Sequence, residues 1–316
     1  MKPALGIDIG TSTMAVTGYA REFVELEING HTPVDVSLTT SPDIGLATGP
    51  HATDIRSPLD SITASRPLNV DGQAFTAPTL MEALMTPWMK DMDHMLGCVP
   101  KRVATIVPSW WADHYREQYR RALSKLYPEV ATVSVAEALS WSMPDDPDQR
   151  VCIWDLGHSQ ASVTLLSPCD RKGRREVTGH VFSPEAGAKT INTVLAQQLG
   201  WGSDEESITC ADYLRHIVSD AGAAAVDVRA TAPDGNTQVF AVQEVTDIIA
   251  SYMSEVIGVF DEHPDTTRCA NRYAIGGMAT DKGVVSALRE HGPLQVMAGP
   301  ATLLSHAACM YALETL

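Results

Sequence analysis

An aspartate, a glycine and three hydroxyl residues stand together near the start of the chain, in Ile7-Asp8-Ile9-Gly10-Thr11-Ser12-Thr13. Glycine lets a backbone turn sharply because it has no Cβ. The N–H groups of such a turn form a concave nest that suits phosphate oxygens. A neighbouring carboxylate suits hydrated Mg²⁺, which prefers one or two carboxylates together with phosphates and waters. We therefore expect Asp8 to hold Mg²⁺ through water, and the turn to contact phosphate through Gly10, Thr11, Ser12 and Thr13.

A second segment repeats this pattern 147 residues later, where Asp155 precedes Gly157, His158 and Ser159. Taken alone, each segment fits a plain β-hairpin with a turn rich in small residues equally well. At the constant offset, however, Asp155 aligns with Asp8, Gly157 with Gly10 and Ser159 with Ser12. Two strand–turn–strand units of one pattern predict a duplicated fold of two lobes, each sending one hairpin into a shared cleft.

Three glycine-containing motifs now carry a resemblance to a known family: residues 7–12, residues 154–159 and Ala274-Ile275-Gly276-Gly277-Met278-Ala279. They resemble the actin-like ATPase superfamily, and most closely the nucleotide-binding domain of DnaK-type (heat-shock 70 kDa) chaperones. Residues 103–111, 70–78 and 186–192 are similar to further segments of that branch. The similarity runs from Leu5 to about Leu313, and its first loop is the specific part. The peptide-binding domain that follows in those chaperones has no counterpart in this sequence.

The resemblance implies an α/β, ribonuclease H-like fold of two lobes with Mg-ATP or Mg-ADP bound between them. Asp8 and Asp155 would be the carboxylates at the base of that cleft, where they hold hydrated Mg²⁺ and orient water. The remaining contacts to the nucleotide would come from the second hairpin, a helix start, the adenine clamp and the glycine pair, namely Gly157, His158, Ser159, Gly187, Arg215, Gly276, Gly277 and Met278.

Several positions depart from the family pattern on the catalytic side. The lysine of the first lobe has no counterpart in residues 58–62, and Arg66 is the nearest replacement. The catalytic glutamate falls near Val133, so Glu137 is the nearest carboxylate. His158 and Ser159 replace glycines, and Ser162 replaces an aspartate that would face Mg²⁺. His158 is also a candidate phosphate donor or titrating group near neutral pH, although a plain turn residue is the simpler interpretation.

The adenine side departs from the pattern as well. The clamp helix keeps Arg215 and Ala221 but loses its glutamate and lysine, and Thr280 replaces a stacking arginine. Lys189, at a helix start, is a weaker phosphate candidate. Removing one positioned electrostatic group costs on the order of 10²–10³ in rate. We therefore expect nucleotide binding with slow ATP hydrolysis at most.

Two other functions fit the same residues. The missing catalytic groups fit a pseudo-ATPase scaffold that acts by recruiting a protein partner. An actin-like filament former is the third interpretation, and the short segment at residues 31–69, where we expect a reduced lobe-I insertion, makes it the weakest. A sugar kinase is disfavoured because the substrate-lobe aspartate motif is not recognisable. Nucleotide binding that depends on Asp8 separates the first interpretation from the others.

The composition limits the partners. The 316-residue chain has a formal net charge of −16, which disfavours nucleic acid and anionic membrane surfaces as partners because both attract clustered lysine and arginine. Six scattered cysteines give neither a disulfide framework nor a zinc site. No apolar run approaches the ~20 residues that span a bilayer, and the N-terminus enters a strand without a signal peptide. The expected location is cytoplasmic, with a nucleotide and an unidentified protein as partners.

The hydrophobic patterns predict alternating strands and helices in two lobes, residues 1–146 and 147–316, with a small insertion at about 203–242. Outside the two hairpins, strands are expected at residues 23–28, 102–107, 130–135, 177–183, 226–231, 237–242 and 273–276. Helices are expected at residues 79–96, 113–126, 136–143, 190–200, 211–220, 243–260, 283–291 and 300–313. An acidic loop is expected at residues 202–207.

Overall fold

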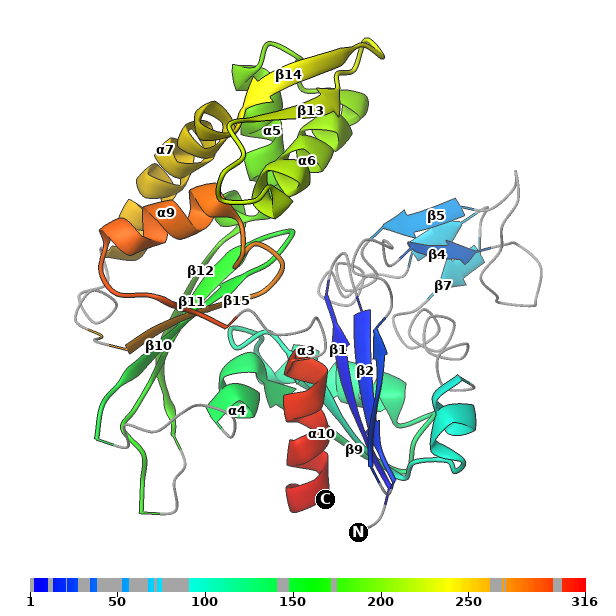
Figure 1. The fold of residues 1–316 in the computed structure, drawn as a ribbon. Coiled ribbons are helices and arrows are strands. Elements are labelled where there is room, and N and C mark those ends of the chain that lie inside the picture. The colour runs from blue at the N-terminus through cyan, green and yellow to red at the C-terminus, as the bar shows by residue number, and fades with distance from the viewer. Residues whose placement is uncertain are drawn as a thin grey trace. The chain divides into compact units, whose positions relative to one another are not determined.

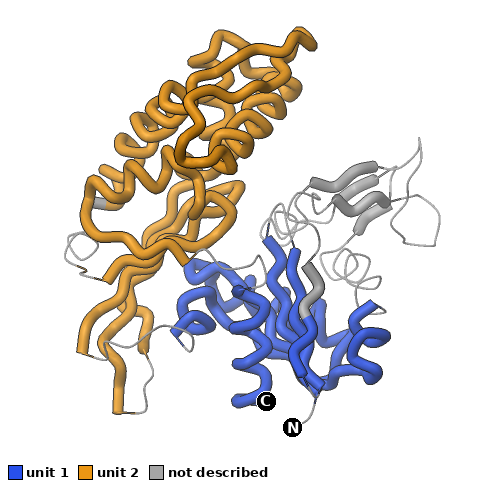
Figure 2. Tube along the Cα trace, viewed as in Figure 1, with its two compact units in different colours: residues 1–145, 299–316 blue, residues 146–298 orange. Residues whose placement is uncertain are grey.

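The protein is an α/β chain that forms two compact units, seen in a computed structural model (Figures 1 and 2). The structure describes residues 3–10, 14–20, 22–27, 35–38, 53–56, 68–70, 73–75, 91–140, 148–171, 175–261, 269, 271–297 and 303–316. Unit 1 comprises residues 1–145 and 299–316, and unit 2 comprises residues 146–298. The C-terminal segment, residues 299–316, thus belongs to the same unit as the N-terminal residues.

The core of unit 1 is a five-stranded mixed sheet. Its order is β3 (Phe23–Glu27), β2 (Met14–Tyr19), β1 (Ala4–Ile9), β8 (Arg102–Val107) and β9 (Glu129–Ser134). The first three strands run antiparallel, whereas β1, β8 and β9 are parallel. Strands β1, β2 and β8 are almost wholly buried, which explains their near-continuous apolar sequences, because strands covered on both faces carry apolar residues on both.

The last helix of the chain, α10 (Leu303–Thr315), packs against β1 of unit 1. Gly6 makes this contact possible, since a Cβ there would stand 1.9 Å from the Ser305 carbonyl oxygen and 2.3 Å from the Cys309 nitrogen. The hydroxyls of Thr17 and Ser305 lie 2.8 Å apart in the same buried interface. A strand near the N-terminus and a helix at the C-terminus therefore share one core. The described part of this unit also contains α3 (Asp113–Leu123), α4 (Val135–Ser140) and a helical segment at residues 91–96.

Unit 2 contains a second five-stranded mixed sheet. Its order is β12 (Val177–Ser183), β11 (Ala161–Leu166), β10 (Val151–Leu156), β15 (Asn271–Ile275) and β16 (Gln295–Val296). The directions repeat those of the first sheet, with β10, β11 and β12 antiparallel and β10, β15 and β16 parallel. The two sheets thus have the same strand order and the same strand directions.

The two hairpins also share one register. In the first, Asp8 pairs with Ala15 and Ala4 with Tyr19. In the second, Asp155 pairs with Ser162 and Val151 with Leu166. Every one of these pairs is carried onto its counterpart by the same offset of 147 residues. Each aspartate therefore occupies the same place on its sheet, one residue before the end of its strand.

The helices of unit 2 pack on its sheet and on one another (Figure 1). They are α5 (Ala188–Gln198), α6 (Glu205–Asp220), α7 (Val242–Asp261) and α9 (Lys282–Glu290). A two-stranded sheet of β13 (Asp227–Thr231) and β14 (Thr237–Ala241) covers part of α6. Trp154 of the sheet meets Phe260 of α7 edge-to-face, with ring centroids 5.2 Å apart, and the helices bury one continuous apolar core with β10, β11 and β15.

Most predicted elements are present with shifts of a few residues at their ends. The acidic loop expected at residues 202–207 is wrong, because α6 begins at Glu205. The side chain of Asp204 accepts a hydrogen bond from the Ser207 nitrogen at 2.9 Å and so caps the helix. The first 12 residues of the helix expected at 79–96 lie outside the described residues, and residues 91–96 are helical.

The remaining described strands of unit 1 form two short antiparallel pairs. They are β4 (Asp35–Leu38) with β5 (Thr53–Arg56), and β6 (Leu68–Val70) with β7 (Gln73–Phe75). Residues 58–62 and Arg66, which bear on the missing lysine, lie outside the described residues. In the part of the chain that the structure covers, no helix combines the length and apolarity needed to cross a membrane.

Candidate functional site

The second hairpin turn is held by its own backbone and by two neighbouring turns. Strand β10 ends with Asp155 and Leu156, after which Gly157 donates its N–H to the Gln160 carbonyl at 3.0 Å. Asp155, Gly157, His158 and Ser159 are all partly exposed at this edge of the sheet. The turn thus keeps backbone and carboxylate groups near the surface while its strands are buried.

Gly187 fixes the turn from the side of α5. A Cβ at Gly187 would stand 2.4 Å from the Ser159 carbonyl carbon and 2.4 Å from the Gln160 nitrogen. The N–H groups of Ala188 and Lys189 donate to the carbonyls of Gly157 and His158, at 3.2 and 2.9 Å. The first N–H groups of α5 are therefore occupied by the turn, so any phosphate at this edge would have to be bound by the turn's own donors.

The predicted glycine pair meets the same turn from the opposite side. Gly276 has a φ of +92°, and a Cβ there would stand 2.5 Å from the Leu156 carbonyl oxygen. That oxygen accepts a hydrogen bond from the Met278 nitrogen at 3.2 Å. Gly276, Gly277 and Met278 therefore lie directly beside the end of β10. Within unit 2, the structure brings together the predicted residues of the hairpin, of the α5 start and of the glycine pair.

Asp155 is the carboxylate of this group of residues. Burial raises its pKa to about 6. A partly buried carboxylate beside a glycine turn fits Mg²⁺, because a cation offsets the cost of burying the charge and Mg²⁺ needs only one or two protein carboxylates. No cluster of three or more His, Cys, Asp or Glu side chains able to hold a metal occurs among the residues that the structure describes. A single carboxylate suits an ion that keeps most of its waters, as Mg²⁺ does.

The first hairpin is described only in part. Asp8 and Gly10 lie at the end of β1, both partly exposed, whereas Thr11, Ser12 and Thr13 lie outside the described residues. Asp8 lies near the Tyr119 hydroxyl, and its negative charge adds to the burial that raises the pKa of Tyr119. Tyr119 in turn accepts a hydrogen bond from the Thr105 hydroxyl at 3.1 Å. Asp8 thus borders the apolar core of unit 1, as Asp155 borders that of unit 2.

Glu137 takes part in a helix cap. Its carboxylate accepts a hydrogen bond from the Ser134 nitrogen at 2.8 Å, and the Ser134 hydroxyl accepts one from the Glu137 nitrogen at 3.1 Å. This reciprocal arrangement is the capping box at the start of α4. Arg116 approaches the same carboxylate at 3.9 Å. The spacing Ser134-x-x-Glu137 in the sequence is the signal that predicts this structural role.

Arg215, expected to contact adenine, is buried among the helices of unit 2. Its guanidinium donates to the side-chain amide oxygen of Asn192 on α5 at 2.9 Å, and to the carboxylates of Asp212 at 2.7 Å and Asp281 at 3.2 Å. The side chains of Arg215 and Asp281 are 4% and 2% exposed. Asp281 also caps α9 by accepting from the N–H groups of Gly283 and Val284. In this conformation Arg215 of α6 links α5 to the N-cap residue of α9.

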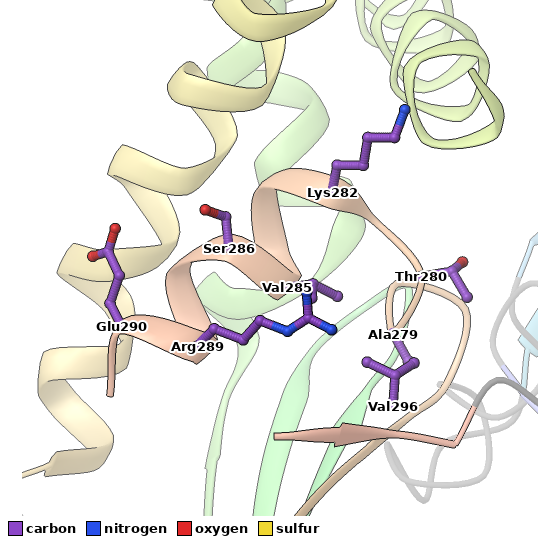
Figure 3. Close-up of a pocket in the computed structure, with 8 residues that line it drawn as sticks. All are labelled: Ala279, Thr280, Lys282, Val285, Ser286, Arg289, Glu290 and Val296. Carbon is purple, nitrogen blue, oxygen red and sulfur yellow. The ribbon is translucent and has the colours of Figure 1, made fainter. Parts of the chain in front are cut away.

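A pocket of about 660 Å³ opens beside the glycine pair (Figure 3). The pocket is lined by the turn that follows the glycine pair, by α9 and by β16. Its lining residues include Ala279, Thr280, Lys282, Val285, Arg289 and Val296. Figure 3 shows the Arg289 side chain running back along α9, so that its guanidinium lies beside Val285 and above Ala279 and Val296. Lys282 points toward α6, where its ammonium donates to the Ala221 carbonyl. Arg289 was not among the residues predicted from the sequence, where its only local signal is its place in the helix that follows the glycine pair.

Comparison with known protein families does not assign a function to this group of turns. No family model matches the chain.

Proposed function

We propose that the protein binds a nucleoside di- or triphosphate with Mg²⁺, at the hairpin turns that carry Asp8 and Asp155. The observation that carries this proposal is the meeting of three turns at the end of β10. The 157–160 turn, Gly187 and the Gly276-Gly277 pair are in backbone contact there, beside a partly exposed aspartate. Glycine at residues 187 and 276 lets these backbone segments pack closely against the end of β10. The N–H groups of the turn and the Asp155 carboxylate therefore lie together at one edge of the sheet, an arrangement that suits phosphate binding.

The shared register of the two hairpins supports a second set of metal- and phosphate-binding groups, in unit 1. Asp8 and Gly10 occupy the positions that Asp155 and Gly157 occupy in unit 2. We propose, on the resemblance to DnaK-type chaperones, that the two units form a duplicated actin-like fold and that both hairpins contact the same nucleotide. Asp8 and Asp155 would then hold the hydrated metal, and the turns would donate N–H groups to the phosphates. Bound Mg²⁺ would supply charge neutralisation for those phosphates.

The same geometry favours binding over rapid hydrolysis. The Glu137 carboxylate is used by a capping box, and the Arg215 guanidinium is held among three helices. Neither group is available in this conformation for positioning water or a base. We therefore propose a nucleotide-binding protein whose turnover is slow, and a pseudo-ATPase scaffold is the second candidate that these two observations favour.

Isothermal titration tests the proposal. The wild-type chain is titrated with Mg-ADP and Mg-ATP, beside D8A and D155N. We expect both variants to lose most of the affinity while remaining folded by circular dichroism. D247N, which removes a carboxylate from the exposed face of α7, is the matched control and should bind as the wild type does.

Two outcomes would count against the proposal. If the wild type releases no heat and shows no change in melting temperature at millimolar nucleotide, nucleotide binding is excluded. If all three variants bind equally, the nucleotide binds away from the hairpins.

A further inference from the structure

We propose that the flat base of the bound nucleotide stacks against the guanidinium of Arg289, in the pocket formed by α9 and the turn after the glycine pair. This inference rests on the proposed function, and it names the side chain that would contact the base. It also differs from the sequence expectation, which selected Arg215 for that role.

Arg215 and Arg289 differ in whether their guanidinium groups already bind other residues. Arg215 has its guanidinium donors committed to Asn192, Asp212 and Asp281. Arg289 is exposed, and no hydrogen bond or ion pair joins its guanidinium to another described residue. Its plane is therefore available to a ligand without breaking an existing contact.

The lining of the pocket favours a flat ring over an anion. Three small apolar side chains line the pocket near the guanidinium: Val285 lies beside it, and Ala279 and Val296 lie below (Figure 3). An anion at this exposed position would gain little from pairing with one arginine, because solvent screens an exposed ion pair. A heterocyclic ring would cover the apolar side chains and stack on the guanidinium plane, an arrangement that arginine favours with aromatic faces.

The position of the pocket suits the base of a nucleotide whose phosphates lie at the second hairpin. The pocket begins at Ala279, the residue after Met278, whose N–H donates to the carbonyl of Leu156. Leu156 immediately precedes Gly157 of the phosphate turn. Residues 278–280 thus contact the end of β10 through Met278 and line the pocket through Ala279 and Thr280.

The test separates contact with the base from contact with phosphate. Mg-ADP and Mg-pyrophosphate are each titrated into the wild type, R289A, R289K and the control R229A, which removes an exposed arginine from β13. We expect R289A to weaken ADP binding by roughly three- to thirtyfold, the range of a lost arginine–ring contact. Pyrophosphate binding should stay within about twofold of the wild type, since that ligand carries no base. R289K should remain weak, because an ammonium lacks the stacking plane, and R229A should bind both ligands normally.

Other outcomes overturn the inference in distinguishable ways. If R289A binds ADP as R229A does, or loses ADP and pyrophosphate equally, Arg289 does not contact the base. Full rescue by R289K would show that Arg289 acts as a simple charge. If the wild type binds pyrophosphate and ADP equally, the base contact fails while the phosphate site stands. If neither ligand binds, both the inference and the proposed function fail.

Discussion

Gly187 and Ser159 are in backbone contact, so close that a Cβ on Gly187 would stand 2.4 Å from the Ser159 carbonyl carbon. The two residues belong to different elements, the start of α5 and the turn of the second hairpin. Neither contact partner is a flexible side-chain end, so the backbone itself must shift to admit a side chain. The position of the candidate phosphate turn therefore depends on glycine at residue 187.

The first prediction concerns this contact. G187A should lower the free energy of unfolding by about 1–3 kcal/mol, the usual cost of overpacking, and should weaken Mg-ADP binding because the turn moves. G222A is the control, since a Cβ there meets no described atom within 4 Å. Urea unfolding and titration of both variants check the prediction. Equal stability and equal affinity for the two variants would show that the turn tolerates displacement.

The second prediction concerns the proton on Asp155. Burial raises its pKa to about 6, against about 3.9 in the unfolded chain. The folded protein therefore binds this proton more tightly, and the resulting stabilisation is complete below about pH 4 and is lost as the pH rises through about 6. D155N has no such proton. Its unfolding free energy relative to the wild type should increase by up to about 3 kcal/mol between pH 4 and pH 7.5.

Urea unfolding of the wild type and D155N at several pH values measures that difference, in which the titration of all other groups cancels. A difference that stays constant from pH 4 to pH 7.5 would mean that the carboxyl titrates normally. Mg-ADP should also bind the wild type more weakly below about pH 6, because protonated Asp155 cannot hold the metal.

The third prediction separates a structural from a ligand-binding role for Arg215. R215A leaves the buried carboxylate of Asp281 without its partner, so it should lower the unfolding free energy by about 3–5 kcal/mol. Below its melting temperature the variant should still bind Mg-ADP. R229A, on the exposed face of β13, should change neither quantity. Loss of affinity with unchanged stability would instead assign Arg215 to the nucleotide.

Local sequence patterns predicted the hairpins well. Asp8 and Asp155 lie next to the ends of their strands, where the apolar runs before the two glycine turns put them, because each hairpin is a local structure whose register follows from its own turn. The strand at residues 102–107 was also correct, since a buried apolar run bounded by polar residues is a local signal. The helix start at Glu205 was missed although Asp204 followed by two glutamates is a recognisable cap.

Long-range contacts could not be read from local patterns. Arg215 and Asp281 are 66 positions apart, and Thr17 and Ser305 are 288 apart. Nothing near Arg215 in the sequence indicates that a helix cap would take its guanidinium. In the same way, nothing near Gly6 indicates that the last helix packs there. The placement of α10 in unit 1, and the choice between Arg215 and Arg289, therefore depend on the tertiary structure.

Amide hydrogen exchange of the wild-type chain, with and without saturating Mg-ADP, shows both whether the nucleotide binds and which backbone segments it protects. If the nucleotide binds at the hairpin turns, exchange slows in residues 8–16, 156–160 and 276–279 and is unchanged in the β13–β14 pair, which serves as an internal reference. Unchanged exchange throughout, or slowing confined to segments other than these turns, would show that no nucleotide binds at the hairpin turns.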